Sequence, residues 1–412
     1  MTRHVIVIGA GITGTATADE LAARGVQVTV LDRDGTRPRG STAFAPGFVG
    51  LYNDAPVLTD LARASAEVYD DAGGGFERRG GLELATSDAG AHDVRRRVAA
   101  AREAGLGAHL LGPDALPAAV TGFVDTSAVV AAGHFPDDGV AVPAVLTAAL
   151  RARAQERGAR FAPGEVVAID VVGPVGAPDR VRVRTSAGQA LTASDVVLAG
   201  GIWGPQLAAM TGLDLPLFPV AHPYTYAAPR ADLVPGPFVR WPEHHVYARV
   251  HGDRLGIGSY DHAPVLVEQA DLAGGAGLRW RDDFDGVIDA AQQLLVPGAR
   301  SAAAERVNGV FAMTPDNLPF VGHHPHLEGV WVAQALWVTH AAGAAGRLVA
   351  AVLDDAPLPR ELSVDRFAAG DVSDEDLRRA ALQLYRDIYA NDGVQVAETR
   401  APDSVSVRSA AR

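Results

Sequence analysis

The sequence contains no cysteine, and this absence excludes several kinds of chemistry at once. Without thiols the chain cannot form a disulfide, bind a metal through thiolates or use a cysteine nucleophile. Long apolar runs are also missing, since none reaches the roughly 18 residues that a membrane-spanning helix needs. The residues before the first apolar run, Met1 to His4, lack the basic region and apolar core of a signal peptide. We therefore expect a cytoplasmic protein that does not bind the membrane.

Clusters of basic residues are absent as well. The 36 Lys and Arg residues are outnumbered by 49 Asp and Glu residues, and a net charge of −13 repels the phosphate backbone of nucleic acids. We expect no nucleic-acid partner. The length of 412 residues is roughly two to three times that of a typical domain. With 48% hydrophobic residues, the chain can bury a sizeable core, and we expect a two-domain protein of enzyme size.

The start of the sequence carries the pattern of a dinucleotide-binding turn. An apolar run over residues 5–8 leads into Gly9, Gly11 and Gly14 in G-x-G-x-x-G spacing, and the next apolar run ends at Asp32. In such a strand–turn–helix, free backbone amides and the positive end of the helix dipole face a pyrophosphate. The acidic residue accepts hydrogen bonds from the adenosine ribose. The pattern predicts a βαβ dinucleotide site without distinguishing FAD from NAD.

Segments of this nucleotide-binding type alternate with segments of alternating strand pattern. We predict an α/β (α+β) fold in which a Rossmann-like cofactor-binding domain is interwoven with a mostly antiparallel substrate-binding sheet domain. The first domain is assigned residues 1–80, 143–215 and 305–370, and the second 81–142 and 216–304. A surface helix at 371–396, opened by Ser373 as N-cap, and a disordered tail at 401–412 complete the prediction. Gly200 ends a buried strand where the backbone is expected to approach the ligand.

Several catalytic patterns are not found. The sequence has no serine elbow, no P-loop and no paired-carboxylate arrangement. His323, His324 and His326 resemble a metal-binding tract, but they lie beside Pro325 without carboxylate or thiolate support. We predict no metal site.

A series of motifs runs through most of the chain in a characteristic order. These motifs are GAGITGTATADELAARG, GSTAFAPGFVG, GGLELAT at 80–86, VVLAGGIWG at 196–204, PVAHPY at 219–224, HGDRLGIGSYDH at 251–262 and the long segment from Val307 to Leu353. With them the chain resembles the FAD-dependent amine oxidases of the D-amino-acid oxidase superfamily. Within that superfamily it is most similar to the flavin domain of dimethylglycine oxidase and the sarcosine and dimethylglycine dehydrogenases. The resemblance is specific for the family and much less specific for the substrate.

The resemblance assigns residues to the cofactor and to the substrate. It implies that the following residues bind FAD: Gly9, Gly11, Gly14, Asp32, Gly40, Ser41, Thr42, Val167, Gly200 and Gly343. His222 and Tyr260 match the pair that the family places over the flavin at the substrate nitrogen. Because only a neutral amine can assist hydride loss, a histidine near pKa 6.5 and a tyrosine hydroxyl suit that position. Arg240 and Arg249 are our candidates for binding a substrate carboxylate.

Two departures from the family pattern qualify these expectations. Relatives that attach FAD covalently do so through a histidine where this sequence has Phe44, so we expect non-covalent FAD. Dimethylglycine oxidase continues into a folate-binding half, whereas this chain stops soon after its last helix. Dimethylglycine as substrate and folate-coupled capture of the one-carbon unit are therefore in doubt.

The leading hypothesis is FAD-dependent oxidation of a secondary or tertiary amine of the N-alkyl amino acid type, with O2 as acceptor. The iminium product hydrolyses to an aldehyde and the dealkylated amine. The same chemistry on a specialised secondary-metabolite amine, such as an N–N-linked amino-acid conjugate, stays open. So does a subunit of a heteromeric complex resembling sarcosine oxidase. The sequence does not separate oxidase from dehydrogenase, because oxygen access depends on cavity shape, and it leaves the oligomeric state open. Nothing in it resembles a nicotinamide site.

Overall fold

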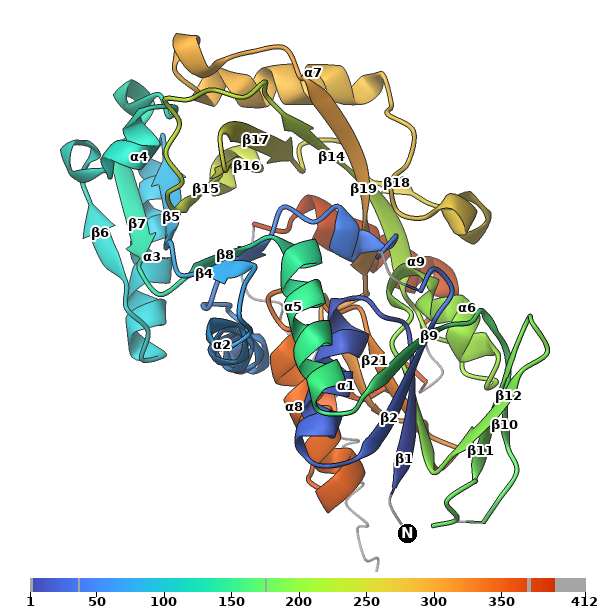
Figure 1. Cartoon of the computed structure of the whole chain (residues 1–412). Helices are drawn as coiled ribbons and strands as arrows, with labels where there is room; N and C mark the ends of the chain where they lie inside the picture. The colour runs from blue at the N-terminus through green and yellow to red at the C-terminus, as the bar shows by residue number, and fades with distance from the viewer. Residues whose placement is uncertain (1–2, 36–37, 175, 369–371, 390–412) are drawn as a thin grey trace, which may run out of the picture.

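The computed structural model of the chain describes residues 3–35, 38–174, 176–368 and 372–389. Its two largest sheets lie at opposite ends of the molecule as drawn in Figure 1, and the chain passes between them several times. This mixed α/β architecture confirms the predicted fold class.

The first sheet is six-stranded and mostly parallel. Its strands lie in the order β20 (Phe320–His323), β21 (Val330–Gln334), β13 (Asp195–Leu198), β1 (His4–Ile8), β2 (Gln27–Asp32) and β9 (Arg160–Pro163). Successive apolar residues of β1 point to opposite faces, as the two-residue period of a strand requires. Val5 and Val7 pack against one core cluster, and Ile6 and Ile8 pack against another. Both faces of this sheet are therefore buried, as is typical of parallel sheets.

Helices cover one face of the six-stranded sheet and a small sheet covers the other (Figure 1). The helices are α1 (Ile12–Ala23), α5 (Pro143–Glu156), α8 (Ala341–Asp354) and α2 (Pro56–Asp70). The small sheet consists of β10 (Val166–Val171), β11 (Val181–Thr185) and β12 (Ala190–Ala193). A short helix, α6 (Gly204–Ala209), follows β13. The carboxyl ends of β1 and β2 thus form the usual edge for a nucleotide.

The second sheet is nine-stranded and mostly antiparallel. Its order is β18 (Val265–Leu266), β14 (Phe218–Tyr226), β17 (Arg254–Ser259), β16 (Val246–His251), β15 (Phe238–Trp241), β5 (Gly81–Ala85), β7 (Ala131–Phe135) and β6 (His109–Leu111), and β19 (Glu305–Met313) pairs with β14. Around it lie α3 (Asp88–Glu103), α4 (Ala118–Thr121) and α7 (Asp283–Ala291). A second small sheet, of β3 (Phe48–Val49), β8 (Gly139–Ala141) and β4 (Phe76–Glu77), lies between the two large ones (Figure 1).

One element differs from the sequence prediction. Residues 305–313, assigned to the cofactor domain, form β19, which pairs with β14 from Phe218 to Tyr226 in the nine-stranded sheet. Helix α9 (Asp374–Arg386) follows Ser373, whose hydroxyl accepts a hydrogen bond from the Asp376 amide as the cap prediction requires. It lies at the surface with its charged side chains exposed, while its opposite face packs on β14 and β19 and buries Tyr385. The predicted tail at 401–412 lies outside the described residues.

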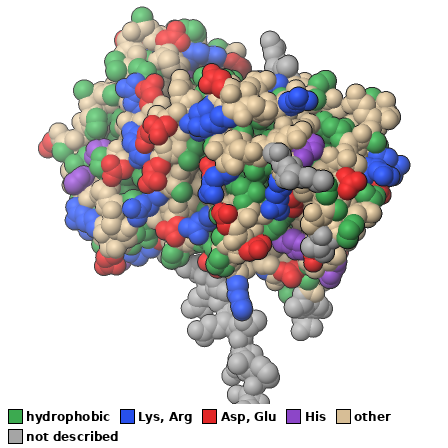
Figure 2. Space-filling model, turned by 60° about the horizontal axis from the view of Figure 1, so that its bottom comes forward, with side chains coloured by type: hydrophobic (Ala, Val, Ile, Leu, Met, Phe, Trp, Pro, Cys, Tyr) green, Lys and Arg blue, Asp and Glu red, His purple; other side chains and the backbone are tan. Residues whose placement is uncertain are grey.

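The exterior carries charges of both signs. Figure 2 shows Arg and acidic side chains interspersed over one face of the molecule. In the described part of the chain no helix is both long enough and apolar enough to cross a bilayer.

Candidate active site

A cavity of about 410 Å³ connects the two large sheets. At one end it is lined by Gly9, Gly11 and Asp32, at the carboxyl edge of the six-stranded sheet. At the other end it is lined by His222, Tyr260 and further aromatic side chains of the nine-stranded sheet. These predicted cofactor and substrate residues thus line one continuous space, although they lie far apart in the chain.

The glycine turn after β1 has the geometry of a dinucleotide cradle. Gly9 has φ of 107°, which disfavours other residues, and a Cβ there would collide with the carbonyl of Ala199. A Cβ on Gly14 would collide with the carbonyl of Gly9, so this glycine permits α1 to pack closely on the turn without itself lining the cavity. Gly11 has ordinary backbone angles and borders the cavity.

The turn is braced by two oxygen acceptors. Asp32 at the end of β2 accepts hydrogen bonds from the amides of Ala10 at 2.7 Å and Asp34 at 2.9 Å. The hydroxyl of Thr42 accepts from the amide of Ile12 at 3.2 Å. These side chains fix the backbone at the start of α1, and a helix N-terminus is a common site for a pyrophosphate.

A second segment runs along the cavity beside the turn. Gly40, Ser41 and Thr42 all line it, as does Gly200 after β13. The Ser41 hydroxyl donates to the carbonyl of Val310 at 2.6 Å, which ties this segment to β19 of the nine-stranded sheet. These four positions agree with an extended ligand that passes from the turn toward the aromatic end.

Besides Gly14, two more predicted cofactor residues do not line the cavity. Val167 lies in a β-bulge where the pairing of β10 skips from Val166 to Ala168, so its side chain is 50% exposed and Val166 lines the cavity in its place. Gly343 is buried away from the cavity. Its amide donates to Ser65 Oγ at 2.9 Å, and a Cβ would collide with the carbonyl of Leu61 on α2.

The reason for the Gly343 error is its place in the helix. α8 begins at Ala341, so Gly343 already lies in the first turn on the face that packs against α2. Val338, Thr339 and His340, just before the helix, line the cavity. Burial lowers the pKa of His340 to about 4, so it is neutral near pH 7.

His222 and Tyr260 are brought together at the aromatic end. Their ring centroids are 4.4 Å apart, and both residues are buried. Burial, followed by the proximity of His262, holds the pKa of His222 well below its usual value, so the imidazole is neutral. Nδ1 of His222 lies 2.7 Å from the Tyr385 hydroxyl and Nε2 lies 2.6 Å from the Tyr247 hydroxyl. Both ring nitrogens are therefore already engaged by protein hydroxyls.

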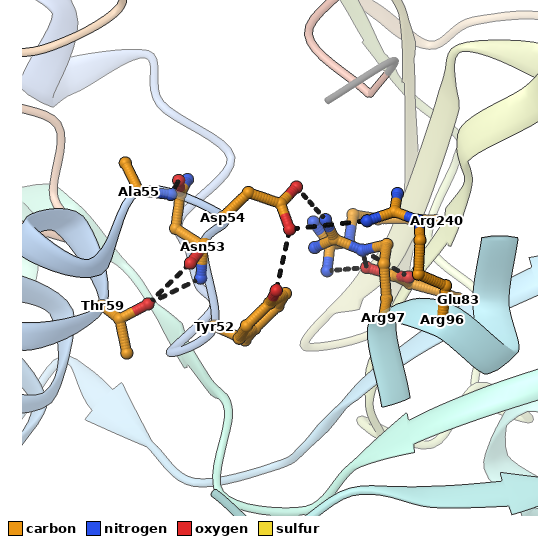
Figure 3. Close-up of polar contacts among 9 residues, drawn as sticks. All are labelled: Tyr52, Asn53, Asp54, Ala55, Thr59, Glu83, Arg96, Arg97 and Arg240. Atoms are coloured by element: carbon orange, nitrogen blue, oxygen red, sulfur yellow. Dashed lines mark hydrogen bonds and ion pairs between the residues drawn. The ribbon is translucent and has the colours of Figure 1, made fainter. Parts of the chain in front are cut away.

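Arg240 belongs to an ionic cluster at the rim of the cavity (Figure 3). Its guanidinium donates to the buried Glu83 at 2.6 Å, and Arg97 donates to the same carboxylate at 3.0 Å. Burial alone raises the pKa of Glu83, but Arg97 and Arg240 outweigh that effect and hold the pKa below its usual value. Asp54 accepts hydrogen bonds from Arg97 at 3.2 Å and from the Tyr52 hydroxyl at 2.7 Å.

Arg249 is placed elsewhere. It is buried and does not line the cavity. Its Nη1 donates to the carbonyls of Pro46 at 3.0 Å and Ala141 at 2.9 Å, with Gly47 at 3.3 Å. These contacts give Arg249 a structural role, holding the segment after Phe44 against β8, in place of the predicted substrate contact.

Phe44 lines the cavity, so no imidazole stands where covalent relatives have their linking histidine.

The histidine tract at 323–326 forms no cluster of metal ligands in the described ranges. His324 is buried, and its Nδ1 accepts from the amides of His326 at 3.1 Å and Leu327 at 3.0 Å, which is a structural use.

Sequence reasoning missed three tyrosines at this end. Tyr247 and Tyr389 line the cavity, and Tyr385 bonds His222 from α9. For Tyr385 the sequence does show a signal, since Leu377, Ala381 and Tyr385 recur every four residues and are all buried. That spacing predicts a helix docked through one face.

Comparison with known proteins gives the family of this chain. Residues 4–352 match the family described as FAD dependent oxidoreductase (DAO). Mouse mitochondrial dimethylglycine dehydrogenase is 27% identical over 82% of this chain and 41% of its own length. The 4-methylaminobutanoate oxidase (formaldehyde-forming) of Paenarthrobacter nicotinovorans is 29% identical over 80% of this chain and 41% of its own. The chain thus spans about two fifths of the length of these relatives.

A solved structure shows the same fold. L-proline dehydrogenase from P. horikoshii superposes with a TM-score of 0.78 at 23% identity, over 90% of this chain and 99% of the other. Together with the match over residues 4–352, these findings identify the chain as a member of the FAD-dependent oxidoreductase family, an enzyme with FAD as its cofactor.

Proposed function

We propose that this enzyme binds FAD non-covalently in the cavity and oxidises a secondary or tertiary amine of the N-alkyl amino acid type. The single observation that carries the proposal is the continuity of the cavity from the glycine turn to the buried pair His222 and Tyr260. The relatives named above act on N-methylated substrates by their names, which is consistent with it.

The ADP half of FAD is assigned to the turn at Gly9 and Gly11 and to Asp32, and the chain beyond it to residues 40–42 and Gly200. FAD supplies a hydride acceptor for the carbon next to the substrate nitrogen. The overall reaction consumes amine, O2 and water and yields the dealkylated amine, an aldehyde and H2O2. The residues of this chain bind the amine, exclude water and remove its proton.

The aromatic end suits an amine. Tyr260, Tyr247, Phe311 and Trp337 line it, and such faces hold an alkylated nitrogen through apolar and cation–π contact. Burial raises the pKa of Tyr260 well above its usual value, so its hydroxyl stays protonated and can orient the substrate nitrogen.

The rim beside Arg240 suits a carboxylate. Arg240 is held in place by the buried carboxylate of Glu83, which Arg97 also contacts. Nε of Arg240 is buried and has no hydrogen-bond partner among the described residues. This Nε–H can donate to a substrate carboxylate.

Replacing Arg240 by leucine is expected to raise KM for an N-methyl amino acid by about 10–100-fold, the range for losing a charge-assisted hydrogen bond. KM for the matching amine without a carboxylate should change little. Steady-state kinetics on both substrates test this, with Arg254→Leu as control, because Arg254 pairs with Glu305 in the same sheet outside the cavity. Equal effects on both substrates would place the carboxylate elsewhere.

Denaturing the yellow protein with acid is expected to leave the flavin in the supernatant, because Phe44 has no nitrogen to bond the flavin 8α-methyl. Mass spectrometry of the precipitated chain should give the unmodified mass. A mass increase of one flavin would contradict the assignment and direct the search for the link to His340, the histidine in the cavity wall nearest to α8.

The function as a whole is tested by mixing the holoenzyme with N-methyl and N-carboxymethyl amino acids under nitrogen. Bleaching of the flavin absorbance, followed by peroxide release when oxygen is admitted, is the expected result. A flavin that no amine bleaches would contradict the proposal.

A further inference from the structure

Four side chains form an unbroken line of hydrogen bonds from the cavity toward the surface. The Tyr247 hydroxyl lies 2.6 Å from His222 Nε2, and His222 Nδ1 lies 2.7 Å from the Tyr385 hydroxyl. The Tyr385 hydroxyl lies 2.9 Å from His262 Nε2. The line joins β14, β16, α9 and the segment after β17, which are distant in sequence.

The two ends of the line lie in different surroundings. Tyr247 lines the cavity, and Tyr247, His222 and Tyr385 are all buried. His262 is half-buried, and its Nδ1 makes a solvent-exposed contact of 2.9 Å with the carbonyl of Ala263. The line therefore starts where a substrate amine is held and ends at water.

The Ala263 carbonyl fixes the tautomer of His262 and thereby the direction in which the line can carry a proton. A carbonyl only accepts, so His262 Nδ1 carries a hydrogen and the neutral ring leaves Nε2 as an acceptor. The Tyr385 hydroxyl then donates to His262, His222 donates from Nδ1 to Tyr385, and Tyr247 donates to His222 Nε2. All hydrogens point from the cavity to the surface. The Tyr385 hydroxyl has one other acceptor, the carbonyl of Ala221 at 3.1 Å, which is longer.

We propose that Tyr247, His222, Tyr385 and His262 form a relay that carries the amine proton of the substrate out to solvent. This relay rests on the proposed amine oxidation. The ammonium N–H bond breaks as a proton passes to the Tyr247 oxygen, each hydrogen in the line moves to the next atom, and the Nδ1 hydrogen of His262 leaves the Ala263 carbonyl for water. Rotation of the two hydroxyls and the two imidazoles then restores the starting direction of the hydrogens. One proton enters and one leaves, no electron moves, and the neutral amine remains for hydride transfer.

The electrostatics favour passage of the proton along the line over its retention on either histidine. Burial lowers the pKa of both His222 and His262, so neither ring retains the proton at neutral pH. The groups facing His222 are Tyr247, Tyr260, Tyr385, Phe311 and His262, none of them an anion. The groups facing His262 are Tyr385, Phe284, Asp261, Arg281 and Asp283.

Replacing Tyr385 by phenylalanine keeps the buried ring and removes one link. We expect flavin reduction at pH 7 by an N-methyl amino acid, which arrives protonated, to slow at least about 10-fold. Reduction by the N-(2,2,2-trifluoroethyl) analogue, which arrives neutral, should proceed near the parent rate. Tyr69→Phe is the matched control, because it removes a buried hydroxyl that donates to the Val338 carbonyl at 2.7 Å outside the line.

A second variant tests the outer end. His262→Ala should show the same substrate-dependent defect, and imidazole in the buffer should restore the rate, whereas pyrazole, a similar ring that does not bind protons at pH 7, should not. Equal slowing of both substrates in Tyr385→Phe, or rescue by both rings, would reduce these residues to a packing role and overturn the relay.

An exchange measurement separates failure of the relay from failure of the proposed function. In protein labelled with 15N-histidine, transfer of saturation from water reports how fast the His222 ring proton exchanges, whether or not any amine is oxidised. We expect this exchange to slow in Tyr385→Phe and to be unchanged in Tyr69→Phe. Unchanged exchange in Tyr385→Phe would overturn the relay even if the amine chemistry holds.

Discussion

Replacing Gly11 by valine is expected to give a folded protein that binds FAD about 100-fold or more weakly and is purified colourless. Gly11 has φ of −67°, which any residue adopts, and an added Cβ would meet only Thr42 Oγ1 at 3.3 Å. The polypeptide can therefore accommodate the side chain. The methyl groups would project into the cavity at the turn and occupy space that the pyrophosphate needs. A 100-fold loss of FAD affinity corresponds to roughly 2.8 kcal/mol of binding free energy.

The measurement is a titration of the apoprotein with FAD, followed by flavin fluorescence. Gly346→Ala is the control, since a Cβ at Gly346 of α8 meets nothing within 4 Å and the position does not line the cavity. Melting of the two apoproteins should agree within a few degrees, which excludes misfolding as the cause. If Gly11→Val retains FAD at the parent affinity, the cofactor does not lie on this turn.

The parts of this site that could be predicted are those encoded by local patterns. The run Val5 to Ile8, the glycine spacing and Asp32 specify a strand, a turn and a helix within about 30 residues, and each requirement is steric or hydrogen-bonding at short range. The Ser373 cap is equally local. Such signals need no knowledge of what packs against them.

The errors concern residues whose partners lie far away in the chain. Arg249 carries a charge that looked free for a substrate, yet its partners are carbonyls of residues 46, 47 and 141, which no local pattern connects to it. Gly343 was expected to face the cofactor, but the approach of α2 at Leu61 decides its role. The surface helix that carries Tyr385 was predicted, but the contact of Tyr385 with His222 was not, because the pairing of β19 with β14 creates the surface on which the helix docks.

The family resemblance supplied what local patterns lacked at the aromatic end. It named His222 and Tyr260, 38 positions apart in the sequence, and the structure places their rings together. It did not reveal that both nitrogens of His222 are already bonded, because Tyr247 and Tyr385 belong to no motif that the sequence displays. The role of His222 therefore follows from its hydrogen bonds and not from its motif alone.

Replacing His222 by alanine is expected to slow anaerobic flavin reduction by about 10²–10⁴-fold, the range for losing a general acid–base group. His222 stands between two hydroxyls, at 2.6 and 2.7 Å, so its removal leaves the substrate proton without a buried acceptor path. FAD content should be unchanged, because the residue lies at the substrate end of the cavity. Tyr260→Phe, which keeps the ring and removes only the hydroxyl, should give a milder loss with a shifted pH dependence.

The matched control is His251→Ala. His251 also lies on the nine-stranded sheet, and its Nε2 bonds the Tyr224 hydroxyl at 2.8 Å, but it does not line the cavity. Loss of either imidazole leaves one or two tyrosine hydroxyls without a partner, at a cost of about 1–3 kcal/mol in the free energy of unfolding for each. Both variants should therefore melt at lower temperature, whereas only His222→Ala should lose flavin reduction. If His222→Ala and Tyr260→Phe both reduce the flavin at the parent rate, the amine is oxidised at another face of the cavity, and the search moves to the wall formed by Trp337 and His340.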